Sequence, residues 1–530
     1  MGGVTLPRLG MAAVGAVAMM GMIAPADAQT PKRGGSAIVV LNQDPTTLNP
    51  DLSTNVPDRI LGCVIFQGLV AAAPDYSIKP LLAKSWTVAA DGLTYSFDLN
   101  KAEWDDGKPF TSADVKYSLI EVSSKFSSVF TRAGAAIDSI ETPAPDKVVI
   151  KMKQTFGPFL LSLACEQGGA ILPKHLFEGT VPQQNPASGA KAIGTGAFKL
   201  AEWVPGDRVR VVRFDKYWEP GKPYLDEVVG KVITVPSSRV QALQSGEVDA
   251  FLRVPPNYIE TIRKDPKLKI EVADASPLLT FAFLNTTRKP LDDKRVRKAL
   301  FMATDRDYLM KNVFFGVGKP GINPFTSDMA WASNSDIDFN KMYHFDIAKA
   351  NALLDEAGVK RGADGKRFSV KITVFSNNYP EFVQAAQAMR ATWAQIGVDA
   401  STEALEDATL IKKEFQDRDF DVGIQTYTSY SDPALGIARM YNQVSIGRSY
   451  GNPSGYSNPQ VEDLLAKGEK SPVTAERGKF YKEAQTILAE DVPLIMLRQY
   501  IDNDAASTKL KGLWGVAQGT GVWSDAWLDK

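Results

Sequence analysis

The chain has 530 residues, of which 44% are hydrophobic and 23% charged, values typical of a globular protein with room for roughly two to four domains. Its 60 Lys and Arg residues balance 61 Asp and Glu residues. No overall field therefore selects nucleic acid, acidic lipid or another polyanion as its partner.

The N-terminus has the features of a secretory signal peptide. Arg8 precedes an apolar run over residues 9–23, and Ala26, Asp27 and Ala28 follow it as a small-residue cleavage site. Because the run is short for a membrane span, we expect residues 1–28 to be cleaved as a signal peptide rather than kept as an anchor. The mature chain is then exported.

Strands and helices are expected to alternate along the chain. Leu93–Leu99 alternates apolar and polar residues behind an Asp-Gly turn, which predicts a half-buried strand. Other expected strands are 37–41, 148–152, 198–203, 209–214, 248–252, 280–284 and 370–375. Expected helices are 59–70, 115–121, 159–164, 238–245, 293–302, 348–357 and 381–396. This alternation predicts an α/β fold.

The stretch Asp421–Pro433 joins a strand to a helix. The strand runs out into Tyr427, Ser429 and Tyr430, and Asp432 followed by proline is a helix-start signal. In open α/β sheets, ligands bind just outside the carboxyl ends of the strands. The turn is therefore predicted to line a pocket.

The motifs of common enzymes and metal sites are missing from the sequence. His175 and His344 lie far apart, and no His-Glu-x-x-His, Gly-x-Ser-x-Gly or Gly-x-x-x-x-Gly-Lys-Ser/Thr motif occurs. We expect no catalytic residue, metal or cofactor. A secreted enzyme that acts through dispersed carboxylates is the alternative.

Cys63 and Cys165 are the two cysteines of the chain. Export permits a disulfide, but both residues lie in apolar stretches, where a thiol packs as a small hydrophobic group. Because nothing in the sequence brings the two sulfurs together, two buried free thiols are favoured over a bond.

Short motifs are spread over the chain from residue 33 to about residue 515. In chain order they are Arg33–Gly35, Leu41–Pro50, Leu81–Trp86, Asp91–Phe97, Trp104–Val115, Gly194–Gly196, Leu243–Asp249, Leu284–Thr287, Pro290–Ala299 and Gly455–Pro459. Together they resemble the family 5 extracellular solute-binding proteins of ABC importers, the dipeptide- and oligopeptide-binding group.

This resemblance implies an α/β fold like that of the type II periplasmic binding proteins, with three lobes. A discontinuous first lobe would gather residues 29–76, 195–277 and 496–530, a β-rich second lobe (77–194) would be inserted in it, and a third lobe would span 278–495. A small solute would bind between the first and third lobes, which close like a hinge. The implied protein is a periplasmic monomer whose partners are that solute and the permease subunits of the inner membrane.

The resemblance also bears on the solute. In peptide-binding members, an aspartate on the turn after the third-lobe strand pairs with the peptide's α-amino group, and here that position holds Ser429. A serine hydroxyl cannot neutralise a buried ammonium. This departure argues against a standard dipeptide. The expected solute is a peptide or a small non-peptide organic molecule, with a sugar among the alternatives. Ser429→Asp is predicted to improve the binding of peptides with a free amino group.

Eight residues are candidates for contact with the solute. Tyr427 and Tyr430 would stack on a ring of the solute. Asp432 is better explained as a helix N-cap. For Asn42, Gln43, Phe66 and Gln67, turn chemistry or core packing is as good an explanation as contact with a solute. The full set is Asn42, Gln43, Phe66, Gln67, Tyr427, Ser429, Tyr430 and Asp432. Arg439 and Arg448 would suit a carboxylate, but solvated arginines are favoured there.

Overall fold

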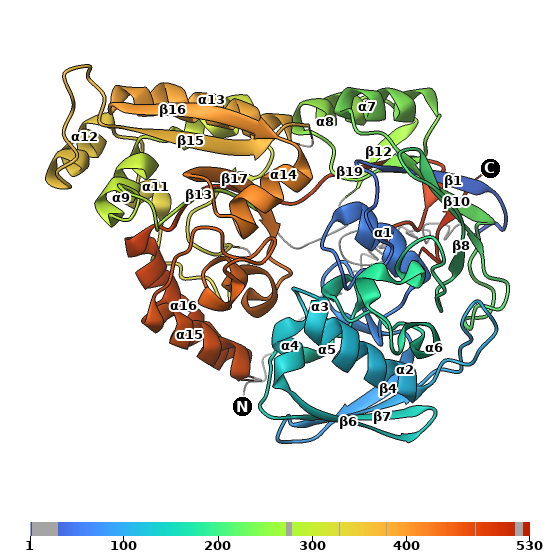
Figure 1. The fold of residues 1–530 in the computed structure, drawn as a ribbon. Helices are drawn as coiled ribbons and strands as arrows, with labels where there is room; N and C mark the ends of the chain where they lie inside the picture. Colours follow the sequence, from blue (N-terminus) through green and yellow to red (C-terminus); the bar gives the residue numbers. More distant parts are fainter. Residues whose placement is uncertain are drawn as a thin grey trace.

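Three larger β-sheets, of seven, four and six strands, organise the described chain, and we call the part of the chain around each the first, second and third lobe (Figure 1). The computed structural model describes Gly2 and residues 30–271, 278–327, 329–377, 379–471, 473–514 and 523–529. The predicted signal peptide and its cleavage site lie outside these residues, apart from Gly2. Within the described ranges, no helix is both long and apolar enough to cross a membrane.

The first lobe is built on a seven-stranded sheet. In spatial order its strands are β12 (Leu268–Glu271), β19 (Asp504–Ser507), β11 (Ala250–Phe251), β1 (Ser36–Leu41), β10 (Glu227–Val232), β9 (Arg208–Arg213) and β8 (Phe198–Val204). β1 is parallel to its neighbours β10 and β11, and the other pairs are antiparallel. The N-terminal, middle and C-terminal parts of the chain thus meet in one sheet. Its helices include α1 (Val56–Ile65), α7 (Pro236–Ser245) and α8 (Ile259–Arg263).

The second lobe contains a four-stranded antiparallel sheet. Its order is β4 (Ala83–Val88), β5 (Thr94–Leu99), β7 (Lys147–Met152) and β6 (Ile137–Ala144). Tyr95, Phe97 and Leu99 are buried while their neighbours are more exposed, which confirms the alternation expected for this strand. The accompanying helices are α2 (Ser112–Tyr117), α3 (Ser124–Phe126), α4 (Thr131–Ala136), α5 (Phe159–Ser162) and α6 (Lys174–Phe177).

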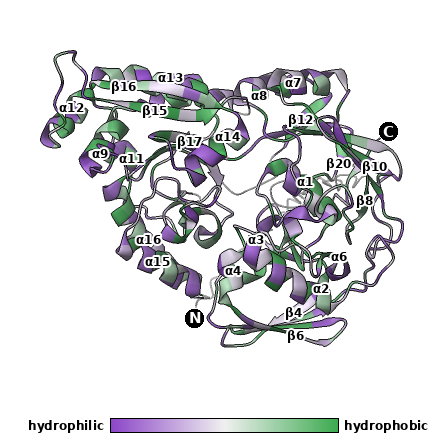
Figure 2. Ribbon diagram, viewed as in Figure 1, coloured by the Kyte–Doolittle hydropathy of each residue, from purple (hydrophilic) through white to green (hydrophobic). Residues whose placement is uncertain are grey.

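The third lobe contains a six-stranded mixed sheet. Its order is β14 (Lys319–Pro320), β18 (Leu494–Tyr500), β13 (Leu278–Leu284), β17 (Val422–Thr428), β15 (Phe368–Phe375) and β16 (Val398–Leu405). Every residue of β13 and β18 is buried, as expected for strands covered on both faces. The helices of this lobe, which carry both hydrophobic and hydrophilic residues (Figure 2), are α9 (Lys294–Met302), α10 (Arg306–Tyr308), α11 (Phe339–Met342), α12 (Ile347–Glu356), α13 (Pro380–Gln395), α14 (Asp407–Ile411), α15 (Pro459–Lys470) and α16 (Thr474–Asp491).

Of the expected boundaries that differ from the structure, two concern the connections between lobes. The boundary expected at residue 495 falls inside β18, because this strand pairs with β13 as far as Tyr500. The helix expected over 59–70 ends at Ile65. Phe66 already has extended backbone, and Leu69 N donates to the Leu163 carbonyl at 3.1 Å. The chain then continues into β2 (Val70–Ala72), which pairs with β3 (Ile78–Pro80).

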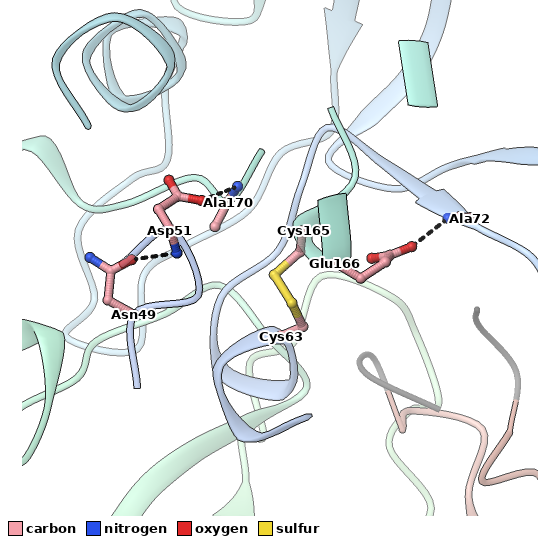
Figure 3. Close-up of a disulfide and its surroundings, with 7 residues drawn as sticks. All are labelled: Asn49, Asp51, Cys63, Ala72, Cys165, Glu166 and Ala170. Atoms are coloured by element: carbon pink, nitrogen blue, oxygen red, sulfur yellow. Dashed lines mark hydrogen bonds between the residues drawn. A yellow bond between two sulfur atoms is a disulfide. The ribbon is translucent and has the colours of Figure 1, made fainter. Parts of the chain in front are cut away.

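A disulfide joins Cys63 of α1 to Cys165 (Figure 3), with a Cα–Cα distance of 5.8 Å. The expectation of two free thiols is therefore wrong. Both residues belong to one buried cluster, so the packing of α1 against the segment after α5 brings the two sulfurs together. The bond fastens a first-lobe helix to the second-lobe segment that holds Glu166, whose carboxylate accepts a hydrogen bond from Ala72 N.

The second and third lobes are docked against each other. Tyr430, Ala434 and Leu435 of the third lobe belong to the buried core of the second lobe. Arg132 forms an ion pair with Glu469, whose carbonyl also accepts a hydrogen bond from Gly157 N at 2.8 Å. These contacts hold the turn after β17 against the second lobe.

Candidate functional site

A cavity of about 970 Å³ lies where the three lobes meet, and we call it the outer chamber. The first lobe supplies residues 42–44 and 50–55, the second supplies 124–129, and the third supplies 406–408 and 448–450. Its volume is within the range of small-molecule sites, roughly 300 to 1,000 Å³. The arrangement can enclose a solute of several hundred daltons or a short peptide.

A second space of about 80 Å³, the inner chamber, shares several wall residues with the outer one. Asn42, Gln43 and Arg59 line both chambers from the first lobe, and Asp407 and Tyr450 line both from the third. The inner chamber adds the arginines Arg253 and Arg439 and the tyrosines Tyr379, Tyr427 and Tyr430. It is a small, aromatic and cationic space at the back of the outer chamber.

Arg59 is positioned by the first turn of α1 and is only 5% exposed. Its Nη1 donates a hydrogen bond to the hydroxyl of Tyr430 at 2.9 Å, across the boundary between the first and third lobes. Its Nη2 is buried and has no hydrogen-bond partner. A buried charged donor without a partner is costly, so this atom marks a place for an acceptor.

Arg439 is held between two aromatic rings. Its guanidinium carbon lies 4.6 Å from the ring centre of Tyr427 and 5.4 Å from that of Tyr430, and its Nε donates to the Gly436 carbonyl. In the part of the chain that the structure describes, neither Arg59 nor Arg439 forms an ion pair with an acidic side chain. The expectation that Arg439 is a solvated arginine is therefore wrong, because tyrosine packing draws it into the chamber wall.

Arg253 follows β11 and joins the first lobe to the third. Its Nε pairs with Asp502 at 2.9 Å, and its Nη1 donates to the hydroxyl of Tyr379 at 2.8 Å. Its φ of 60° lies in a region that non-glycine residues adopt rarely, so the surrounding contacts fix this conformation. Unlike Arg59 and Arg439, Arg253 has its counter-charge within the protein.

The arginines make the inner chamber electropositive. Burial alone would raise the pKa of the Tyr430 hydroxyl, but the charges of Arg59, Arg439 and Arg253 outweigh it and this pKa lies below its usual value. Behind the wall, burial raises the pKa of Glu414 to about 8, so this carboxyl is mostly neutral at pH 7. It provides little counter-charge for the arginines.

The Asp432 carboxylate interacts with other groups of the protein. It caps the helical turn that begins at Pro433, accepting a hydrogen bond from Ala434 N at 2.9 Å, which confirms the predicted N-cap. Both of its carboxylate oxygens also accept from Arg477, at 2.8 and 2.6 Å. Asp432 is therefore a support of the turn rather than a contact for a solute.

Ser429, the residue expected to replace the family's aspartate, is fully buried. The described residues that line the two chambers do not include it. A Cβ at Gly436 would lie 2.2 Å from the Ser429 carbonyl oxygen, so the following turn packs directly on its backbone. An aspartate at 429 would have to enter this packed region.

Phe66 and Gln67 do not lie on the helix, contrary to expectation. Phe66 caps the end of α1 and is fully buried. Gln67 pairs with the backbone of Ile171, donates from Nε2 to the Tyr217 hydroxyl at 3.0 Å and accepts from Trp218 Nε1 at 3.1 Å. Both side chains belong to the core, because α1 ends before them.

Among the described residues, no group of three or more His, Cys, Asp and Glu side chains could hold a metal ion. The wall of the inner chamber presents guanidinium donors, tyrosine rings, and the half-buried amides of Asn42 and Gln43. Sequence reasoning missed Arg59 and Arg253. Arg253 could have been identified as a candidate from its position directly after an apolar strand, where ligands bind in α/β sheets.

Comparisons with known proteins agree with this architecture. The family model described as bacterial extracellular solute-binding proteins, family 5 Middle, matches residues 77–447. The glutathione-binding protein GsiB of Escherichia coli (strain K12) is 29% identical over 487 residues, 90% of this chain and 91% of that protein.

Solved structures of solute-binding proteins are similar to this chain over most of its length. The oligopeptide-binding protein AppA from Bacillus subtilis, in complex with a nonapeptide, has a TM-score of 0.84 at 26% identity and covers 94% of this chain and 100% of its own. The binding protein AgaA from A. tumefaciens R10, in complex with agropinic acid, has a TM-score of 0.80 at 26% identity, with coverages of 94% and 99%.

Proposed function

Since the chain belongs to the family 5 bacterial extracellular solute-binding proteins, we propose that it captures one small solute in the two chambers and delivers it to an ABC permease of the inner membrane. The observation that carries this proposal is the cavity of about 970 Å³ walled by all three lobes. Its polar and aromatic wall has the character of a ligand site.

Capture would involve closure of the first lobe on the third. In this proposal the first lobe gathers residues 29–76, 195–277 and the tail after Tyr500, and the second lobe spans 77–194. The hydrogen bonds from Arg59 to Tyr430 and from Arg253 to Tyr379 join the two sides of the cleft. They support an arrangement in which a solute becomes enclosed and the permease meets the closed form.

The proposal includes export. The relatives are extracellular solute-binding proteins, and the N-terminal segment has a basic residue, an apolar run and a small-residue site. We propose cleavage after Ala28 and action in the periplasm as a monomer. Mass spectrometry of the protein recovered from the periplasm tests this, since a mature chain starting at Gln29 is expected.

The relatives' solutes differ in chemistry, being glutathione, a nonapeptide and agropinic acid by their names. The solute of this chain is therefore best inferred from its own cleft. Ser429 lines neither chamber, so its lack of charge does not decide whether the solute is a peptide. A peptide or a small organic molecule is the proposed class.

A thermal-shift screen of the exported protein against peptides, sugars and carboxylated metabolites tests the function. A solute at about 100 times its dissociation constant adds about 2.7 kcal/mol to stability, which moves the unfolding midpoint measurably. A shift by any small solute, with that solute recovered unchanged, supports a binding protein. Chemical conversion of the solute would instead indicate the alternative of a secreted enzyme.

A further inference from the structure

We propose that the inner chamber is a carboxylate subsite, in which Arg59 and Arg439 together hold an anionic end of the solute. The solute class is then an organic acid or a peptide with a free carboxylate rather than a neutral sugar. The inference rests on the proposed solute capture and specifies its chemistry.

Arg59 carries the first part of the argument. Its side chain is almost fully buried at a wall that both chambers share, and its Nη1 donates a hydrogen bond to the hydroxyl of Tyr430. The Nη2 donors have no partner. Because a buried charge is normally paired and hydrogen-bonded, an oxyanion on Nη2 would complete this group.

Arg439 provides the second guanidinium. The rings of Tyr427 and Tyr430 hold its guanidinium group, and its Nε donates a hydrogen bond to the Gly436 carbonyl. Its two Nη groups have no ion-pair partner among the described side chains. A planar guanidinium held in one orientation suits a carboxylate, which it binds through two parallel hydrogen bonds.

The start of α1 strengthens the field at the same place. Thr54 and Val56 line the inner chamber, and the N-cap residue Asn55 lines the outer one. The Asn55 side chain makes no capping hydrogen bond. The positive end of this ten-residue helix therefore faces the cavity, where an anion is stabilised. Asp58, in the first turn, instead accepts hydrogen bonds from Thr46.

The balance of charge decides between an acid and a neutral solute. Within the described chain, Asp407 is the single acidic side chain in the wall of the inner chamber, against three arginines. Arg253 is paired with Asp502, so Arg59 and Arg439 together exceed Asp407 by one positive charge. A sugar would accept hydrogen bonds from the arginines but would leave their positive charge unpaired. A carboxylate would accept the hydrogen bonds and also pair with the charge.

The outer chamber has a wall of mixed charge. It carries the acidic residues Asp44, Asp51, Glu406 and Asp407 and the basic residues Arg59, Lys125 and Arg448. Hydroxyls from the second lobe, including those of Ser127 and Ser128, also line it. With the solute's carboxylate inward on Arg59 and Arg439, its amino or hydroxyl groups lie in the outer chamber, where acidic side chains and hydroxyls accept hydrogen bonds.

Matched probe pairs test the inference. Mono-, di- and tricarboxylic acids and di- and tripeptides are compared with their carboxamide forms by thermal shift and then by titration calorimetry. Wild type is expected to bind at least one acid and to bind its amide far more weakly. Arg59→Gln and Arg439→Gln should each weaken the acid by about 30-fold or more, because one partner of a buried charge pair is lost.

A surface arginine provides the control. Arg263 is exposed and paired with Glu260, so Arg263→Gln should leave acid binding unchanged. Arg59→Lys, which keeps the charge but loses the planar fork, should bind more tightly than Arg59→Gln. The midpoint of each variant without solute shows whether it is folded.

The outcomes distinguish a failure of the carboxylate subsite from a failure of solute capture. Binding of a sugar or an amide as tight as that of any acid, or undiminished acid binding by both glutamine variants, overturns the carboxylate subsite and leaves solute capture standing. A wild-type protein that no probe of any class stabilises contradicts both.

Discussion

The ion pair between Asp432 and Arg477 is the buried contact that fixes the cleft-lining turn. Its hydrogen bonds are 2.8 and 2.6 Å long, and the side chains of Arg477 and Asp432 are 6% and 10% exposed. Asp432→Asn keeps the size of the residue and its ability to cap the following turn. The substitution therefore removes only the charge and leaves Arg477 buried without its partner.

Breaking one side of a buried pair costs about 3–5 kcal/mol, and we expect Asp432→Asn to lower the free energy of unfolding of the third lobe by that amount. Urea denaturation followed by circular dichroism measures it. The matched control is Asp463→Asn, whose exposed pair with Lys467 should contribute less than about 0.5 kcal/mol. Equal losses in the two variants would refute the reasoning that burial of the pair sets its value.

Three further predictions concern other parts of the molecule. Removal of the disulfide between Cys63 and Cys165, which are 102 residues apart, should lower the free energy of unfolding by about 4–5 kcal/mol in the chain-entropy model. Urea denaturation of wild type and of the double alanine variant measures this loss. A loss under about 1 kcal/mol would contradict the prediction. Because burial raises the pKa of Glu414 from 4.5 to about 8, the stability that its neutral form contributes below pH 4.5 is lost as the pH rises through 8. The fall in thermal midpoint between pH 5 and 9 should therefore be smaller in Glu414→Gln, and identical slopes would count against a neutral buried carboxyl. Leu435→Ala removes a side chain buried in the second-lobe core, so it should lower the free energy of unfolding by about 2–5 kcal/mol. Urea denaturation measures this, and a loss under about 1 kcal/mol would contradict the packing of Leu435 in that core.

Local patterns predicted much of the fold. The alternation in Leu93–Leu99 predicts the buried face of β5, and Asp432 before proline predicts the helical turn that follows. The end of α1 was not predictable, because the residues after it pair with a distant segment: Gln67 with Ile171 and Leu69 with Leu163. The strand Leu494–Tyr500 was also missed as a unit, since a fully buried strand shows no alternation.

The cleft was predictable in position but not in chemistry. Resemblance to the family led to Asn42 and Gln43, which lie in the walls of both chambers, and their contact with a solute remains a prediction. Arg59 was missed because an arginine on a helix usually belongs to a solvated face. Only the packing of α1 against the third-lobe turn reveals that its charge is buried, just as only packing brings the two cysteines together.

The central claim is that one small solute binds in the cleft and leaves it chemically unchanged. Titration calorimetry of the exported protein with the best probe of the matched-pair screen, followed by chromatography of the recovered solute, tests this claim most directly. We predict saturable binding of one solute per chain and complete recovery of the same compound. Conversion of the solute, or the absence of saturable binding, would contradict the account.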